Sequence, residues 1–73
     1  MDTANSTNLT VTLNGRKAAT SAQTLAEFIA ENGFGGSKIA TAVNGEFVPE
    51  RARAATRLNP GDTIEVVSAR QGG

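Results

Sequence analysis

The sequence predicts an α+β fold, with one main helix packed on one face of a mixed four- or five-stranded sheet. Two segments of alternating apolar and polar residues each run into an Asn-Gly pair, which is typical of a β-hairpin turn. A segment with helical spacing lies between them. In a single small domain of 73 residues, this two-layer arrangement buries every apolar face.

The first hairpin is expected over residues 9–20. Leu9, Val11 and Leu13 alternate with threonines, as the residues of a half-buried strand do. Asn14-Gly15 follows directly and tolerates the positive φ angles of a type I′ turn. Residues 16–20 should therefore return as the second strand.

The helix is predicted over residues 25–32. Thr24 and Glu27 fit a capping box at its start, and Gly33 supplies the expected stop at its end. The apolar residues between them share one helical face. The glycine-rich run 33–36 superficially resembles a phosphate-binding loop. Such loops precede a helix, however, so we expect this run to be a plain helix stop and connector.

A second hairpin should follow, with strands at residues 39–43 and 46–48 on either side of Asn44-Gly45. Pro49 ends it, because proline has no N–H to donate to a neighbouring strand. Residues 50–58 are less regular, and we expect a turn of helix followed by a short extended piece.

The last strand is predicted over residues 63–68, after a type II turn with Pro60 and Gly61 at its centre. Within this strand Ile64 and Val66 should point inward.

The domain is expected to span residues 9–68, between a disordered leader (1–8) and a flexible C-terminal tail (69–73). Much of the apolar content is alanine, so the core must rest on a few larger residues. The expected core residues are Leu9, Val11, Leu13, Leu25, Phe28, Ile29, Ile39, Val43, Val48, Leu58, Ile64 and Val66.

The composition argues against several functional classes. The chain has no Cys and no His, which removes thiol nucleophiles, the commonest zinc ligands and the usual general base. No metal site and no stably bound cofactor are expected. The formal charge is zero, which speaks against nucleic-acid binding. With no membrane span and no apolar signal core, a cytoplasmic protein is expected. A core this thin leaves little room for a catalytic cleft, which weighs against an enzyme.

The candidate functional feature is the terminal pair Gly72-Gly73. Glycine has no Cβ, so such an end can enter a narrow channel and present its carboxylate to a reacting group. When extended, residues 69–73 would reach roughly 17 Å. The alternative, an arbitrary end of the chain, stays open at this point.

Three stretches carry a resemblance to a known family: AVNGEFVP at residues 42–49, LNPGDTIEVV at 58–67 and RQGG at 70–73. Together with the order of elements, they resemble the ubiquitin-like, β-grasp sulfur carriers, and above all the ThiS family of thiamine biosynthesis. The likeness covers about residues 9–73. The polar leader 1–8 departs from it, since such carriers usually begin almost at the first strand.

The resemblance implies a mechanism in which the chain is a substrate of partner enzymes. A ThiF-like adenylyltransferase would draw in the tail of Arg70, Gln71 and Gly72 and let the Gly73 carboxylate attack MgATP. Sulfur from a persulfide enzyme would then displace AMP and leave a thiocarboxylate on Gly73. A ThiG-like thiazole synthase would use that sulfur to build the thiazole ring of thiamine.

Strand alternation predicts where the activating enzyme docks. If Ile64 and Thr41 face the helix, their strand neighbours must face outward. The expected partner-binding face therefore consists of Ala40, Ala42 and Val67. An alternative docking surface is the basic cluster of Arg51, Arg53 and Arg57.

Other functions remain open at this stage. The small subunit of molybdopterin synthase has the same Gly-Gly end and activation, although the RQGG ending and the NGEFVP run favour thiamine. A ubiquitin-like protein modifier is a further alternative. From a different class, a β-grasp RNA-binding or regulatory module would share the fold, but few exposed aromatic residues are available for stacking on bases.

Overall fold

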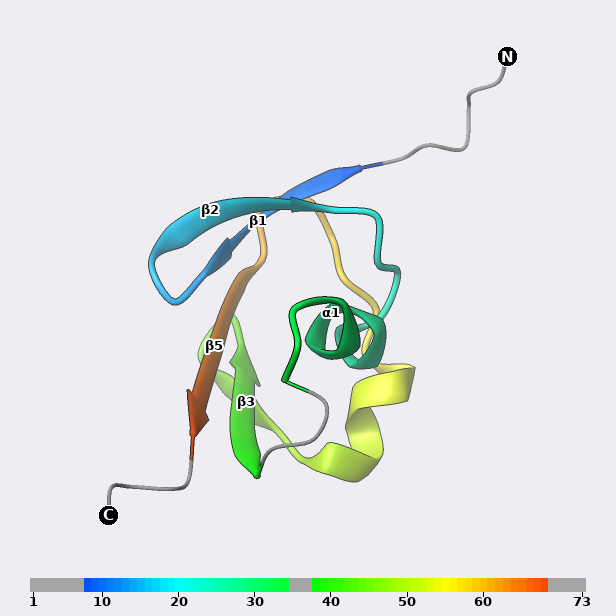
Figure 1. Ribbon diagram of the computed structural model, residues 1–73, viewed down its shortest axis with the longest axis vertical. Coiled ribbons are helices and arrows are strands. Elements are labelled where there is room, and N and C mark those ends of the chain that lie inside the picture. Colours follow the sequence, from blue (N-terminus) through cyan, green and yellow to red (C-terminus); the bar gives the residue numbers. More distant parts are fainter. Residues whose placement is uncertain (1–7, 35–37, 69–73) are drawn as a thin grey trace.

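The computed structural model describes residues 8–34 and 38–68 and contains a five-stranded mixed sheet, with strand order β2-β1-β5-β3-β4. One α-helix and one 3₁₀-helix lie on the same side of this sheet (Figure 1). This confirms the predicted α+β class. The elements are β1 (Leu9–Leu13), β2 (Arg16–Thr20), α1 (Leu25–Glu31), β3 (Ile39–Val43), β4 (Glu46–Val48), the 3₁₀-helix η1 (Glu50–Ala55) and β5 (Thr63–Ser68).

Strand β5 joins the two hairpins into one sheet. It pairs in parallel with β1, where Leu13 lies opposite Ile64, and antiparallel with β3, where Thr41 lies opposite Val66. The hairpin partners β2 and β4 form the two edges of the sheet. The last strand in the sequence therefore occupies the centre of the fold.

Both hairpin turns have the predicted backbone conformation. Asn14 and Asn44 have φ angles of 50° and 53°, and the glycines that follow them have φ angles of 87° and 85°. Positive φ at both central positions defines a type I′ turn, whose twist matches that of the flanking strands.

Helix α1 begins with the expected cap. The Glu27 N–H donates to Thr24 Oγ1 at 3.2 Å, and the Glu27 carboxylate accepts from the Gln23 N–H at 2.8 Å. The helix ends at Glu31, one residue earlier than predicted, and Asn32 forms its C-cap. Gly33 follows with a φ of 83°, in agreement with its expected role as a stop. Residues 35–37, in the glycine-rich connector, lie outside the described residues.

The core lies between α1 and the sheet, and it is narrower than predicted. The buried apolar residues are Val11, Ala22, Leu25, Phe28, Ile29, Val48, Leu58, Ile64 and Val66. Leu9, Leu13, Ile39 and Val43 were also expected in the core, but they are only partly buried against it. They occupy strand ends. A seven-residue helix is about 10 Å long and a five-residue strand about 17 Å, so the helix covers only the middle of the sheet.

The segment between β4 and β5 has the predicted form, a short helix followed by extended chain. After η1, backbone hydrogen bonds tie the extended part to the start of α1. The Leu25 N–H donates to the Thr56 carbonyl at 2.8 Å, and the Leu58 N–H donates to the Gln23 carbonyl at 3.0 Å. These bonds fix α1 and η1 beside each other on the same face of the sheet.

Candidate functional site

The face of the sheet opposite α1 and η1 holds the candidate docking site. Among the described residues, two large apolar side chains are strongly exposed, Phe47 at 67% and Val67 at 60%. Their strand neighbours Val48 and Val66 are buried. Because successive side chains of a strand point to opposite faces, Phe47 and Val67 both project from the outer face.

The register of the strands brings these residues together. Ala42 on β3 lies opposite Phe47 on β4 and opposite Glu65 on β5, so the three form one row across the sheet. In the next row, Ala40 lies opposite Val67. We call the surface formed by Ala40, Ala42, Phe47 and Val67 the outer patch.

The sequence predicted three of these four residues. Ala40, Ala42 and Val67 lie on one face and next to one another, with both alanines half-buried. Phe47 was missed, although the signal was present: in a strand that places Val48 inward, the preceding residue must point outward. Its ring adds the largest apolar side chain of the patch. That the patch binds a partner remains a prediction.

The outer patch lies beside the C-terminal end of β5. Val67 is the second-last residue of β5, and the final residue, Ser68, lies opposite Ile39 at the start of β3. The predicted reacting group, the Gly73 carboxylate, and the predicted threading residues Arg70, Gln71 and Gly72 lie outside the described residues. The chain thus leaves the described fold beside the outer patch.

Two turn asparagines fix the position of β5. Asn14 Nδ2 donates to the Val66 carbonyl at 3.1 Å, and the Val66 N–H donates to Asn14 Oδ1 at 2.9 Å. On the other side, the Thr63 N–H donates to Asn44 Oδ1 at 3.0 Å, and Asn44 Nδ2 donates to Asp62 Oδ1 at 3.0 Å. The Asn14 amide thus bonds the backbone of β5 as a neighbouring strand would, whereas the Asn44 amide joins the first N–H of β5 to the Asp62 carboxylate. The turn at the end of each hairpin therefore holds the strand that leads to the tail.

One of the three arginines of the alternative docking surface makes hydrogen bonds within the fold. Arg53 is half-buried on the helix side of the sheet, where its Nε donates to Thr41 Oγ1 at 3.1 Å. Its Nη2 donates to the Ile39 carbonyl at 2.9 Å. Arg53 therefore braces η1 against β3, while Arg51 and Arg57 are exposed. The sequence could not show this, because the acceptors lie on a distant strand.

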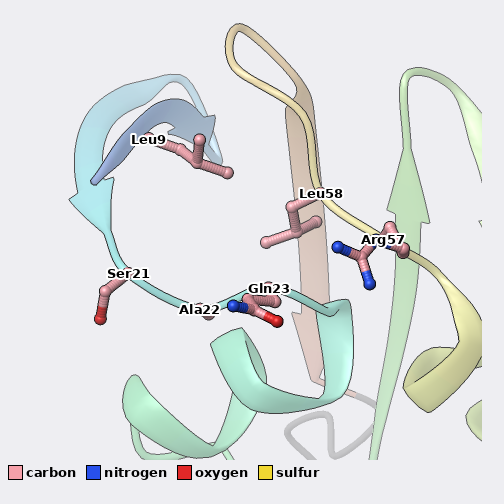
Figure 2. A pocket seen from close by; sticks show the side chains of 6 residues that line it. All are labelled: Leu9, Ser21, Ala22, Gln23, Arg57 and Leu58. Carbon is pink, nitrogen blue, oxygen red and sulfur yellow. The ribbon is translucent and has the colours of Figure 1, made fainter. Parts of the chain in front are cut away.

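A shallow, open pocket of about 180 Å³ lies at the other end of the fold, near the start of β1. Figure 2 shows Leu9 on the strand above, Ser21, Ala22 and Gln23 along the loop below, and Leu58 and Arg57 on the segment to the right. The pocket is lined by Leu9, Ser21, Ala22, Gln23, Arg57 and Leu58. The Gln23–Leu58 backbone bond described above spans its wall. The pocket thus lies where the segment before α1 is hydrogen-bonded to the segment before β5, and its form follows from that packing.

Neither a metal centre nor a membrane span is found in the part of the chain that the structure describes. Within residues 8–34 and 38–68, no three His, Cys, Asp or Glu side chains are grouped so that they could hold a metal ion. No helix in these ranges is long and apolar enough to cross a membrane.

Comparisons with known proteins give the fold through a solved structure and the family through a family model. The crystal structure of a thiamine biosynthesis protein (ThiS) from Geobacter metallireducens superposes with a TM-score of 0.74. It is 23% identical in sequence, and the match covers 89% of this chain and 100% of that one, so it establishes the β-grasp fold. A search of curated protein sequences found no match. A model of the ThiS family matches residues 8–73, which is nearly the whole chain. The chain therefore belongs to the ThiS family.

Proposed function

We propose that this chain is a sulfur carrier of thiamine biosynthesis, and that its C-terminal Gly73 carries the sulfur as a thiocarboxylate. The observation that carries the proposal is the ThiS family match, which extends through Gly72 and Gly73. The absence of Cys and His from the sequence is consistent with it, because a carrier of this kind reacts through its main-chain carboxylate. The chain is then a substrate, and the catalytic groups belong to its partners.

The proposed chemistry begins with activation by a ThiF-like adenylyltransferase. An oxygen of the Gly73 carboxylate attacks the α-phosphorus of MgATP, and pyrophosphate leaves. The resulting acyl-adenylate has AMP as a good leaving group, whereas a free carboxylate resists attack by sulfur. MgATP is consumed at the active site of the partner and is not a cofactor of this chain.

Sulfur then enters from a persulfide enzyme. The terminal sulfur of the persulfide attacks the activated Gly73 carbonyl carbon, and AMP leaves. A second thiol then attacks the inner sulfur of this acyl disulfide. The inner sulfur and the attacking thiol end as a disulfide, and the transferred sulfur stays on Gly73 as a thiocarboxylate. A ThiG-like thiazole synthase takes up this sulfur during thiazole formation.

The outer patch is the proposed docking face for the activating enzyme. Its four residues are apolar or small, and they lie beside the end of β5, on the face that α1 and η1 leave uncovered. A partner seated there would be close to the point where the chain leaves the sheet. Gly73 would then enter the partner's active site first, and Gly72, Gln71 and Arg70 would follow it into the channel.

Deletion of Gly73 tests the proposal. We expect ATP–pyrophosphate exchange by the activating enzyme to be lost, because the carboxylate ends one residue short of the reaction site. Circular dichroism should show an unchanged fold. Adding one alanine after Gly73 retains every residue but displaces the carboxylate, and it should abolish exchange as well. Removal of residues 2–7, which precede the family match, serves as the matched control and should leave exchange intact. Undiminished exchange by the Gly73 deletion would contradict the carrier function.

A further inference from the structure

The row that crosses the outer face at Ala42 places an aromatic ring and a carboxylate on either side of a small residue. Phe47 lies opposite Ala42 on β4, and Glu65 lies opposite it on β5. Adjacent strands are about 4.8 Å apart, so the Cβ atoms of Phe47 and Glu65 are separated by roughly 10 Å. Between them the methyl group of Ala42 forms a low floor. We call this row the slot: the exposed side chains of Phe47 and Glu65 stand on either side of Ala42 and form one apolar and one anionic wall.

The anionic wall has no partner within the described chain. Glu65 is exposed, and within residues 8–34 and 38–68 the structure shows no hydrogen bond or ion pair to its side chain. Lys17 shares the outer face, but it lies two strands away, in the row of Thr12 and Thr63. The charge of Glu65 is thus available to a molecule that docks on this face.

A partner that docks on this face must neutralise the charge of Glu65. A carboxylate that is covered by an interface and left unpaired is strongly unfavourable, so a partner that covers the outer patch needs a cation opposite Glu65. Arginine fits this slot better than lysine. Its planar guanidinium can stack on the Phe47 ring and pair with a carboxylate through two parallel hydrogen bonds. Its aliphatic stem can lie on the methyl group of Ala42.

We propose that an arginine of the activating enzyme lies across Ala42, stacked on the Phe47 ring and paired with the Glu65 carboxylate. This proposal rests on the proposed function, because it assigns the outer patch to the activating enzyme. Under this proposal Glu65 is a specificity-determining residue. Many apolar protein surfaces could pack on the outer patch, but a partner without a cation opposite Glu65 would leave its carboxylate buried and unpaired. A shortened or enlarged side chain at position 42 would change the depth of the slot.

The test measures the affinity of the full-length carrier for the activating enzyme by titration calorimetry, at low and high salt. We expect Glu65→Gln to weaken binding by about 30-fold or more, because it removes one partner of a desolvated charge pair. The substitution should also reduce the salt dependence of binding. Phe47→Leu keeps an apolar side chain but removes the aromatic ring, and it should weaken binding by about fivefold. The double variant should lose less than the product of the two single effects, because both residues contact the same arginine.

Glu50→Gln is the matched control. It removes an exposed carboxylate from η1, on the other side of the sheet, and should leave affinity and salt dependence unchanged. Thermal melts of all variants should coincide with that of the native chain. If Glu65→Gln binds as tightly as the native chain while Ala42→Arg binds weakly, the arginine contact is wrong and the docking face stands. If the native chain neither binds the enzyme nor supports ATP–pyrophosphate exchange, the proposed function itself fails.

Discussion

Replacement of Asn14 by glycine tests how the first hairpin holds the strand that leads to the C-terminal tail. The Asn14 side chain makes two hydrogen bonds to the backbone of Val66, at 2.9 and 3.1 Å. Glycine removes both bonds while still accepting the φ of 50° at this position. Glycine relieves strain at positive φ, which stabilises the folded chain by about 1 kcal/mol. It also gives the unfolded chain more freedom, which destabilises the fold by about the same amount, so the two effects nearly cancel. The variant therefore isolates the contribution of the side chain.

The expected loss is substantial for a chain of this length. Each hydrogen bond contributes about 0.5–1.5 kcal/mol, so the free energy of unfolding should fall by about 1–3 kcal/mol. The total for a 73-residue domain is roughly 4–11 kcal/mol. At about 4–8 °C per kcal/mol, a loss near the middle of this range lowers the melting temperature by about 10 °C.

The assay combines urea denaturation with amide hydrogen exchange. The Val66 N–H and carbonyl point toward β1, so the N–H of the neighbouring Glu65 points toward β3. In Asn14→Gly, exchange at Val66 should accelerate more than exchange at Glu65. Asn8→Gly, at an exposed position before β1, is the control and should change the stability by less than about 0.5 kcal/mol. An unchanged denaturation midpoint together with unchanged exchange at Val66 would refute the reasoning.

Three further substitutions separate the roles of the tail, the outer patch and the buried arginine. Gly72→Val should sharply slow thiocarboxylation, because a β-branched residue stiffens and widens the tail, and a native rate would contradict the narrow channel. Ala42→Arg should weaken binding to the activating enzyme without lowering the melting temperature, and calorimetry that finds native affinity would move the docking face elsewhere. Arg53→Met should lower the free energy of unfolding by about 1–3 kcal/mol through the loss of two hydrogen bonds, whereas the exposed Arg51→Met should change it by less than about 0.5 kcal/mol. Equal melting temperatures for the two arginine variants would show that Arg53 does not brace η1.

Features that depend on neighbours in the sequence could be predicted. The Asn14-Gly15 and Asn44-Gly45 turns, the Thr24 cap and the alternation in β5 each follow from a few consecutive residues, and the structure agrees with all of them. The outward position of Ala40, Ala42 and Val67 required only strand parity and an assumed inner face. The same rule predicts that Phe47 points outward, although Phe47 was not among the predicted residues of the partner-binding face.

Features that depend on distant pairing could not be predicted. The bonds from Asn14 to Val66 join residues 52 positions apart, and they exist only because β5 lies between the two hairpins. Arg53 looked like part of an exposed cluster because its acceptors on β3 are set by the way η1 folds back over the sheet. Similarly, only the register places Glu65 in one row with Ala42 and Phe47.

The central claim is that Gly73 carries sulfur, and intact mass spectrometry of the chain isolated from host cells growing without added thiamine tests it most directly. We expect a population heavier than the unmodified chain by the difference in mass between one sulfur and one oxygen atom. Fragmentation should place that difference at Gly73. Chains that carry only an unmodified Gly73 carboxylate while the cells make thiamine, or a Gly73 joined through an amide bond to a lysine of another protein, would contradict the account.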